Sequence, residues 1–134
     1  MKGLIAAVLI SSLVFLTSCT DVWAPTPPPP PPPDALSWAD AKYHIGERVT
    51  ICGDVIDTRW ASDIEGKPTF LDIGKPYPDP NRFTVVISID CRTNFPQAPE
   101  EYYSGKHICI TGLIEENDNI PQIEACYPSQ IQEY

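Results

Sequence analysis

The chain has 134 residues, of which 9 are Lys or Arg and 18 are Asp or Glu, so its formal net charge is −9. Proteins that bind nucleic-acid backbones without sequence preference gain affinity by neutralising phosphates, which requires the opposite sign of charge. The composition therefore argues against strong, non-specific binding of DNA or RNA.

The N-terminus has the pattern of an export signal. Lys2 supplies the basic residue, and the uncharged stretch from Gly3 to Leu16 supplies the short apolar segment. This stretch is too short to span a membrane, since a spanning helix needs about 20 apolar residues. We therefore expect residues 1–18 to be a cleaved signal peptide, and its removal, which takes Lys2 with it, changes the net charge from −9 to −10.

The end of this segment, Leu16-Thr17-Ser18-Cys19, resembles the lipobox of bacterial lipoproteins, in which a cysteine is acylated and becomes the first residue after cleavage. The resemblance implies that Cys19 carries lipid and anchors the protein at a cell membrane, facing the extracytoplasmic side. Acyl chains hold a protein firmly because each buried methylene contributes about 0.8 kcal/mol. The alternative is an ordinary signal peptide with a chance cysteine at its end.

Residues 19–33 form a proline-rich segment with an unbroken run from Pro27 to Pro33. Such a run adopts extended polyproline II, at about 3.1 Å per residue. We interpret the segment as a stiff tether between the lipid and a domain over residues 34–134. The alternative is a PxxP-type ligand for a recognition domain.

The elements of this domain can be predicted in chain order. Ser37-Trp38-Ala39-Asp40 has the pattern of a capped helix start, and Gly46 ends this short helix. Pro99–Tyr103 predicts one or two further helical turns, between the third and fourth strands. Apolar alternation predicts five strands, at residues 49–56, 68–73, 83–89, 107–115 and 120–125. The fold class is therefore mainly β.

Two segments, Tyr43–Gly53 and Tyr102–Gly112, form a weak internal repeat in which a strand begins after one glycine and contains another. Glycine inside a strand tends to mark a bulge or a sharp bend, which lets a small barrel coil its long strands. Gly53 and Gly112 are therefore predicted to mark such places, and the two strands favour a closed or nearly closed barrel.

The pattern from Gly46 to Ile131 resembles OB-fold domains of the nucleic-acid-binding, tRNA anticodon-like type. The resemblance implies a small five-stranded OB-fold-like barrel, an architecture whose members bind oligonucleotides, sugars, peptides or proteins. It rests on Val49-x-Ile51-x-Gly53-x-Val55, Thr69-Phe70-Leu71-Asp72-Ile73-Gly74, Phe83-Thr84-Val85-Val86-Ile87 and Ile108-x-Ile110-x-Gly112.

Four cysteines follow Cys19, and an even number in an exported chain indicates disulfides. None stands in a C-x-x-C pair, so two disulfides are favoured over a zinc site, and no metal or cofactor is expected. The OB-fold resemblance places strand one beside strand four and strand three beside strand five. It thereby selects Cys52–Cys109, with both side chains pointing outward, and Cys91–Cys126. The alternative is four free thiols.

No catalytic constellation is present, and His44 and His107 stand where surface or capping roles are expected, so an enzyme is not predicted. The stretch that builds the ligand surface of an OB-fold contains cations beside aromatics, which suits stacking on bases or sugar rings. Acids such as Asp57 and Asp72 make this stretch nearly neutral, so an ordinary mixed surface is the alternative. The candidate ligand-binding residues are Arg59, Trp60, Tyr77 and Arg82.

Two functions remain in view. The first is a monomeric, non-enzymatic binding module for an oligonucleotide, a glycan or a protein, presented outside the cytoplasm by its lipid. The second is a structural or assembly protein of the cell envelope. Its acidic surface, from Glu100 to Glu133 with only Lys106 opposing it, would dock a basic protein partner.

Overall fold

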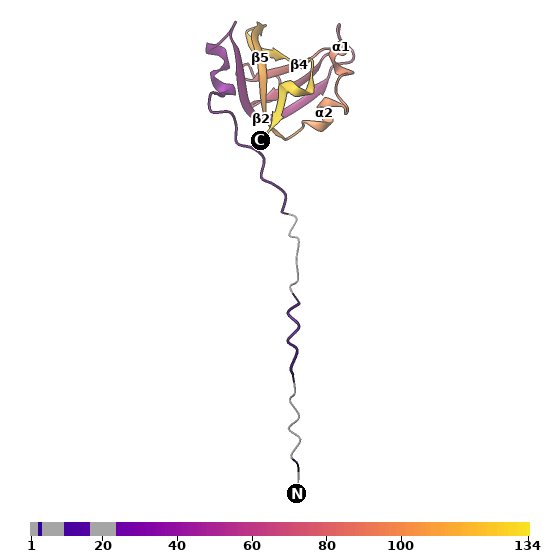
Figure 1. Ribbon diagram of the computed structural model, residues 1–134. Helices are drawn as coiled ribbons and strands as arrows, with labels where there is room; N and C mark the ends of the chain where they lie inside the picture. Colours follow the sequence, from indigo (N-terminus) through magenta and orange to yellow (C-terminus); the bar gives the residue numbers. More distant parts are fainter. Residues whose placement is uncertain (1–2, 4–9, 17–23) are drawn as a thin grey trace.

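The computed structural model describes residue 3 and residues 10–16 and 24–134. Cys19, the predicted lipid attachment site, lies outside the described residues, as does most of the predicted signal peptide. Residues 24–32 form neither helix nor strand and lead away from the barrel in an extended path (Figure 1). Among the helices of the described segments, none has the length and apolar character needed to cross a membrane.

Two long strands close the barrel. β2 (Arg48–Trp60) pairs along its first half with β5 (His107–Asn117) and along its second half with β3 (Thr69–Ile73). Beyond β3 the sheet continues with β4 (Phe83–Ile87) and β6 (Ile120–Glu124). Because β6 pairs with β5 in turn, the sheet returns to its starting strand. The protein is therefore an OB-fold-like barrel, as the sequence predicts.

The sheet has 7 strands where the sequence predicts five. The two additional strands are short: β1 (Leu36–Ser37) lies parallel to β2, and β7 (Ile131–Glu133) lies antiparallel to β5. Neither is long enough to show apolar alternation, so the sequence pattern could not reveal them.

Helices connect the strands at three places. The predicted N-terminal helix is a 3-10 helix, η1 (Trp38–Tyr43), and the predicted turns before β5 form α2 (Pro99–Tyr102). A second 3-10 helix, η2 (Pro128–Gln130), precedes β7. The third predicted strand was expected to reach residue 89, but α1 (Ile89–Arg92) begins there. The Ser88 carbonyl accepts backbone hydrogen bonds from Cys91 and Arg92, and these replace the ladder of a strand.

Gly53 of β2 pairs with Ile108 of β5, and Gly112 of β5 pairs with Val49 of β2, without a register shift, so of the predicted bulge or bend the bulge is absent at both glycines. The bulge of β2 lies between Val55 and Asp57 instead. Gly53 serves close packing, because a Cβ there would lie only 2.6 Å from Cδ1 of Trp38. A Cβ on Gly74 would overlap the same indole.

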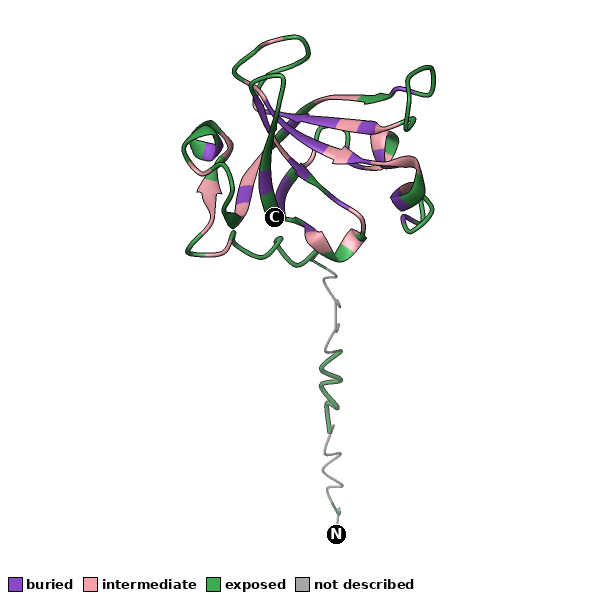
Figure 2. Cartoon of the chain, turned by 90° about the horizontal axis from the view of Figure 1, so that it is seen from above, coloured by how far each residue is buried: buried purple, intermediate pink, exposed green. Residues whose placement is uncertain are grey.

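The core fills the barrel with alternate side chains of its strands. Phe83, Val85 and Ile87 of β4 are fully buried, as are Ile108 and Ile110 of β5. Figure 2 shows this interior as the buried stretches of the strands, while the connecting loops are mostly exposed. The alternate residues of β3 and β4 face outward, where they form the floor of the candidate site described below.

Both disulfides have the predicted pairing. Cys52 and Cys109 are directly opposed on β2 and β5, with a Cα–Cα distance of 4.1 Å. Cys91 of α1 bonds Cys126, which follows β6, at a Cα–Cα distance of 4.6 Å. Cys109 lies between the core residues Ile108 and Ile110 on β5, so the strand period points it outward as predicted, although it is only 2% exposed. It pairs alongside Gln132 of β7, one of the strands that the sequence did not predict.

Candidate ligand-binding cleft

A cleft of about 260 Å³ lies on the outer face of the sheet formed by β2, β3, β4 and β6. Its floor follows from the two-residue period of a strand: Thr69, Leu71 and Ile73 are buried in the core, so Phe70 and Asp72 face the other way. The lining comes from five strands, with Asn117 at the end of β5, and from the loops between them: Arg59, Ile64, Phe70, Asp72, Tyr77, Arg82, Thr84, Asn117, Asp118, Ile120 and Gln122.

Three of the four predicted ligand residues meet in this cleft. The guanidinium carbon of Arg59 lies 4.6 Å from the centre of the Tyr77 ring, and that of Arg82 lies 5.1 Å from it. Arg59 also covers Phe70, at 5.0 Å from the ring centre. Tyr77 remains 51% exposed. The predicted cluster of an aromatic ring with two cations therefore exists, at the position where OB-folds bind their ligands.

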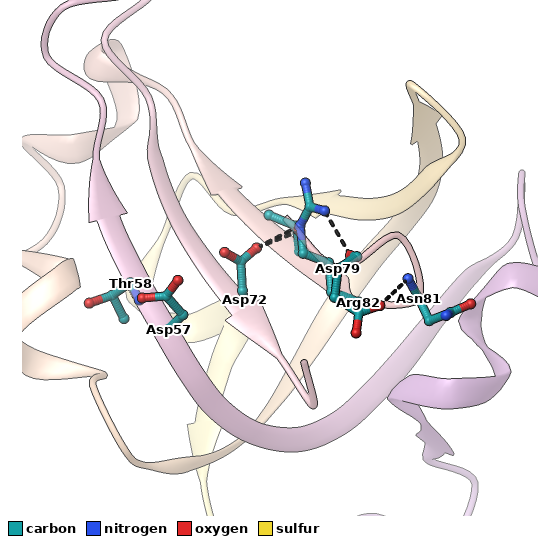
Figure 3. A network of polar contacts seen from close by, with 7 residues as sticks. Asp57, Thr58, Asp72, Asp79, Asn81 and Arg82 are labelled. Carbon is teal, nitrogen blue, oxygen red and sulfur yellow. Dashed lines mark hydrogen bonds and ion pairs between the residues drawn. The ribbon is translucent and has the colours of Figure 1, made fainter. Parts of the chain in front are cut away.

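The loop between β3 and β4 holds this cluster in place. Asp79 caps a tight turn by accepting a hydrogen bond from the backbone N–H of Asn81 at 2.8 Å. The Asp79 carbonyl accepts a second bond from Nη1 of Arg82, also at 2.8 Å (Figure 3). Three prolines, Pro76, Pro78 and Pro80, restrict the same loop, so little ordering is needed when a ligand contacts it.

Asp72 is a buried carboxylate at the floor of the cleft. It is 3% exposed, its Oδ1 accepts a hydrogen bond from the Thr84 hydroxyl at 2.8 Å, and the same oxygen lies 3.3 Å from Nε of Arg82 (Figure 3). Burial raises the pKa of Asp72, while the Thr84 hydrogen bond and the Arg82 charge oppose the shift. Nε of Arg82 is itself buried and has no hydrogen-bond partner among the described residues. The pair is therefore incompletely bonded.

Trp60 does not reach the cleft. It follows Arg59 on β2, so the strand period points it to the opposite side, where Arg92 lies 4.2 Å from its ring centre. Arg92 also donates to both carboxylate oxygens of Glu100, at 2.7 Å and 2.8 Å, and to the Thr69 hydroxyl. The prediction that Trp60 belongs to this cluster is therefore wrong, because its side chain lies on the other face of the sheet.

Sequence reasoning missed much of the cleft floor and rim. The outward position of Phe70 and Asp72 could have been predicted, because a strand with one core face places its outward residues at every second position. No local pattern predicts the contribution of Asn117, Asp118 and Gln122, since only the pairing of β6 with β4 and β5 brings this part of the chain to the cleft.

The acidic segment behind the second hypothesis is partly neutralised within the protein. Glu100 forms the ion pair with Arg92, which holds the pKa of that carboxyl below its usual range. Lys106 forms an ion pair with Glu133. Glu115 and Glu116 remain exposed on β5. Within residues 24–134, no three His, Cys, Asp or Glu side chains gather into a group that could hold a metal ion.

Comparisons with known proteins found no matching family model and no matching curated protein. Among solved structures, a protein described as an aspartyl-tRNA synthetase from Leishmania major Friedlin matches 96% of this chain, at 10% identity and a TM-score of 0.45. The asparaginyl-tRNA synthetase of Pyrococcus horikoshii matches 73% of it, at 12% identity and a TM-score of 0.46. The aspartyl-tRNA synthetase of Entamoeba histolytica matches 68%, at 14% identity and a TM-score of 0.43.

This chain spans only 23%, 22% and 19% of those three chains, respectively. Strand order and the position of the cleft define the class of protein: a small OB-fold-like barrel with a polar cleft on its outer sheet face.

Proposed function

We propose that this protein is a lipid-anchored, non-enzymatic OB-fold module that acts as a monomer outside the cytoplasm and binds a polar, ring-containing ligand. The observation that carries the proposal is the meeting of Arg59, Tyr77 and Arg82 over a concave, partly buried floor. An aromatic ring beside planar hydrogen-bond donors can contact the face of a base or sugar while fixing its polar groups.

The lipid anchor is supported by the sequence around Cys19 and by the proline run that follows it. Metabolic labelling with an alkyne-palmitate tests this part. We expect label in the wild-type chain, none in Cys19→Ser, and release of the unlabelled variant from the membrane fraction. Equal labelling of both chains would remove the anchor from the proposal and leave the binding cleft untouched.

The binding cleft is tested with the full chain in detergent micelles, titrated with short single-stranded oligonucleotides and with neutral oligosaccharides. We expect Tyr77→Ala to weaken binding by about tenfold, since aromatic stacking contributes on the order of 1–3 kcal/mol per ring. Trp60→Ala is the matched control, because it removes a similarly exposed aromatic side chain from the opposite face. A ligand that binds both variants as it binds the wild type binds elsewhere.

The assembly function is separable from this one by charge. It needs free acids, and Glu115 and Glu116 on β5 are exposed. The test is capture of a basic envelope protein by the wild type and by two variants. Salt-sensitive capture that is lost in the double variant Glu115→Lys with Glu116→Lys, but is unchanged in Tyr77→Ala, would favour the assembly function over the binding module.

A further inference from the structure

We infer that the cleft binds a neutral carbohydrate, one sugar ring at a time, with the Asp72 carboxylate accepting hydrogen bonds from sugar hydroxyls. This inference rests on the proposed function, because it assigns a ligand class to the same cleft. Its grounds are the charge of the lining, the free acceptor at the floor, and the size of the space.

The lining holds no surplus of positive charge. Two arginines, Arg59 and Arg82, are balanced by the two acids Asp72 and Asp118. Arg82 is already engaged with the Asp79 carbonyl and faces Asp72. A protein gains affinity for a nucleic-acid strand when its cations neutralise the phosphates. This cleft has little unbalanced positive charge to neutralise them. A neutral sugar requires no such surplus.

The floor offers an acceptor that suits a hydroxyl group. The described contacts of Asp72, from Thr84 and Arg82, both converge on Oδ1. Oδ2 takes no hydrogen bond from any residue in the part of the chain that the structure describes. An ionised carboxylate can only accept hydrogen bonds, so it attracts hydroxyl donors and repels phosphate oxygens.

The rim provides the complementary groups. Asn117 and Gln122 carry amides, each of which donates and accepts, and the Thr84 hydroxyl retains acceptor capacity after donating to Asp72. Sugar hydroxyls also donate and accept, so a ring with several hydroxyls can satisfy these groups together. Apolar contact for the ring comes from Ile64, Ile120 and the exposed half of Tyr77.

The size of the cleft and its few aromatic rings also favour a single sugar ring over a nucleic-acid strand as the ligand. The cleft, at about 260 Å³, is slightly smaller than the usual range of small-molecule sites, about 300–1,000 Å³. An OB-fold that binds single strands covers about 4–16 nucleotides and presents aromatic faces to successive bases. Here Phe70 lies beneath Arg59 and Tyr77 is the exposed aromatic ring of the lining, so the cleft offers one ring rather than a series of rings for successive bases.

Calorimetric titration of the full chain in detergent micelles tests the inference. The probes are maltotetraose, cellotetraose and chitotetraose, with a short oligothymidylate in parallel, each at low and high salt. We expect at least one sugar to bind with an affinity that changes by less than about twofold with salt, because no ion pair forms. We expect the oligothymidylate not to bind.

Variants locate the sugar. Asp72→Asn is expected to weaken binding by about tenfold or more, since hydrogen bonds to a charged group contribute about 1.5–3 kcal/mol. Asp90→Asn on α1 is the matched control, an exposed acid outside the cleft, and should leave binding unchanged. Asn117→Ala, at the exposed rim, should weaken binding without touching the core.

Each contrary outcome has a distinct meaning. Salt-sensitive oligothymidylate binding that needs Tyr77, without sugar binding, overturns the carbohydrate inference but preserves the binding module. Sugar binding indifferent to Asp72→Asn and Asn117→Ala also overturns it. Failure of every sugar to bind at millimolar concentration overturns it as well, and failure of the oligothymidylate alongside it counts against the binding module itself.

Discussion

Two arginine–carboxylate pairs lie on opposite faces of β3, and they differ in how completely they are bonded. Arg92 and Glu100 form two parallel hydrogen bonds, at 2.7 Å and 2.8 Å, and Arg92 is further held by Thr69 and by the Trp60 ring. Arg82 and Asp72 approach only to 3.3 Å, and Nε of Arg82 has no hydrogen-bond partner among the described residues.

The pKa values of the two carboxyl groups shift in opposite directions because a different influence dominates at each. The hydrogen bonds from Arg92 lower the pKa of Glu100, whereas burial raises the pKa of Asp72 because its partners do not compensate for lost water. A fully bonded pair stabilises the fold and has no capacity left for a ligand. An incompletely bonded pair retains that capacity, and the second pair lies in the cleft.

The largest difference is expected on removal of each arginine. Arg92→Met should lower the free energy of unfolding by about 3 kcal/mol, because Glu100 is left mostly buried without its partner. Arg82→Met should cost only about 1 kcal/mol, since the lost ion pair is a longer contact, at 3.3 Å, and Asp72 keeps its hydrogen bond from Thr84. Chemical denaturation of the two variants measures both values. Equal losses would show that the two pairs do not differ as the geometry indicates.

The second largest difference is expected in how the two pairs contribute to stability as the pH falls. The folded-state pKa of Glu100 lies below its unfolded value, so its contribution to stability is present at neutral pH and is lost as the pH falls through that lowered value. Asp72 has the opposite sign, because its raised pKa makes the folded state gain stability as the carboxyl is protonated.

Denaturation curves from neutral pH to about pH 3 test these signs. Glu100→Gln should lose stability less steeply on acidification than the wild type. Asp72→Asn should lose it more steeply, because the compensating gain from Asp72 is gone. Parallel curves for all three chains would contradict the assignment.

A smaller effect is expected at Trp60. Trp60→Ala should lower the free energy of unfolding by about 1 kcal/mol, the scale of a cation–π contact at an exposed site. Binding in the cleft should not change, since the ring lies on the other face. Loss of ligand binding in a folded Trp60→Ala variant would contradict the placement of the cleft.

The smallest stability change is expected for Asp72→Asn. The amide can retain its contact with Thr84 and escapes the cost of burying a charge, so the free energy of unfolding at neutral pH should change by less than about 1 kcal/mol. Differential scanning calorimetry measures the change. A loss as large as that of Arg92→Met would make Asp72 a structural residue.

Much of the fold could be predicted because it depends on local periodicity. Alternation in β2 and β5 indicated the strands, and the strand order implied by the OB-fold resemblance then selected the cysteine pairs. The end of β4 could not be read, because Ile89 continues the apolar phase and only the hydrogen bonds of Cys91 and Arg92 to Ser88 show that a helix has begun. The bulge predicted at Gly53 is wrong for a similar reason, since the role of this glycine depends on its packing against the distant Trp38.

The site was predicted in part, and the errors in its prediction have two origins. Composition along the chain gathered Arg59 and Trp60 as neighbours, yet adjacent residues of a strand face opposite ways. The same rule applied to Thr69–Ile73 would have placed Asp72 beside Phe70 on the outer face. The contribution of Asn117 and Gln122 depends on long-range pairing, which no local pattern encodes.

The packing of Trp38 also decides where a functional truncation can begin. A chain shortened to start at Arg48 would keep β2 through β7, yet it would lack the indole that covers Gly53 and Gly74. Gly74 is the first residue of the loop that carries Tyr77, and Trp38 also lines a hollow with Pro80, Asn81 and Arg82. The boundary of the working unit therefore lies before the barrel itself.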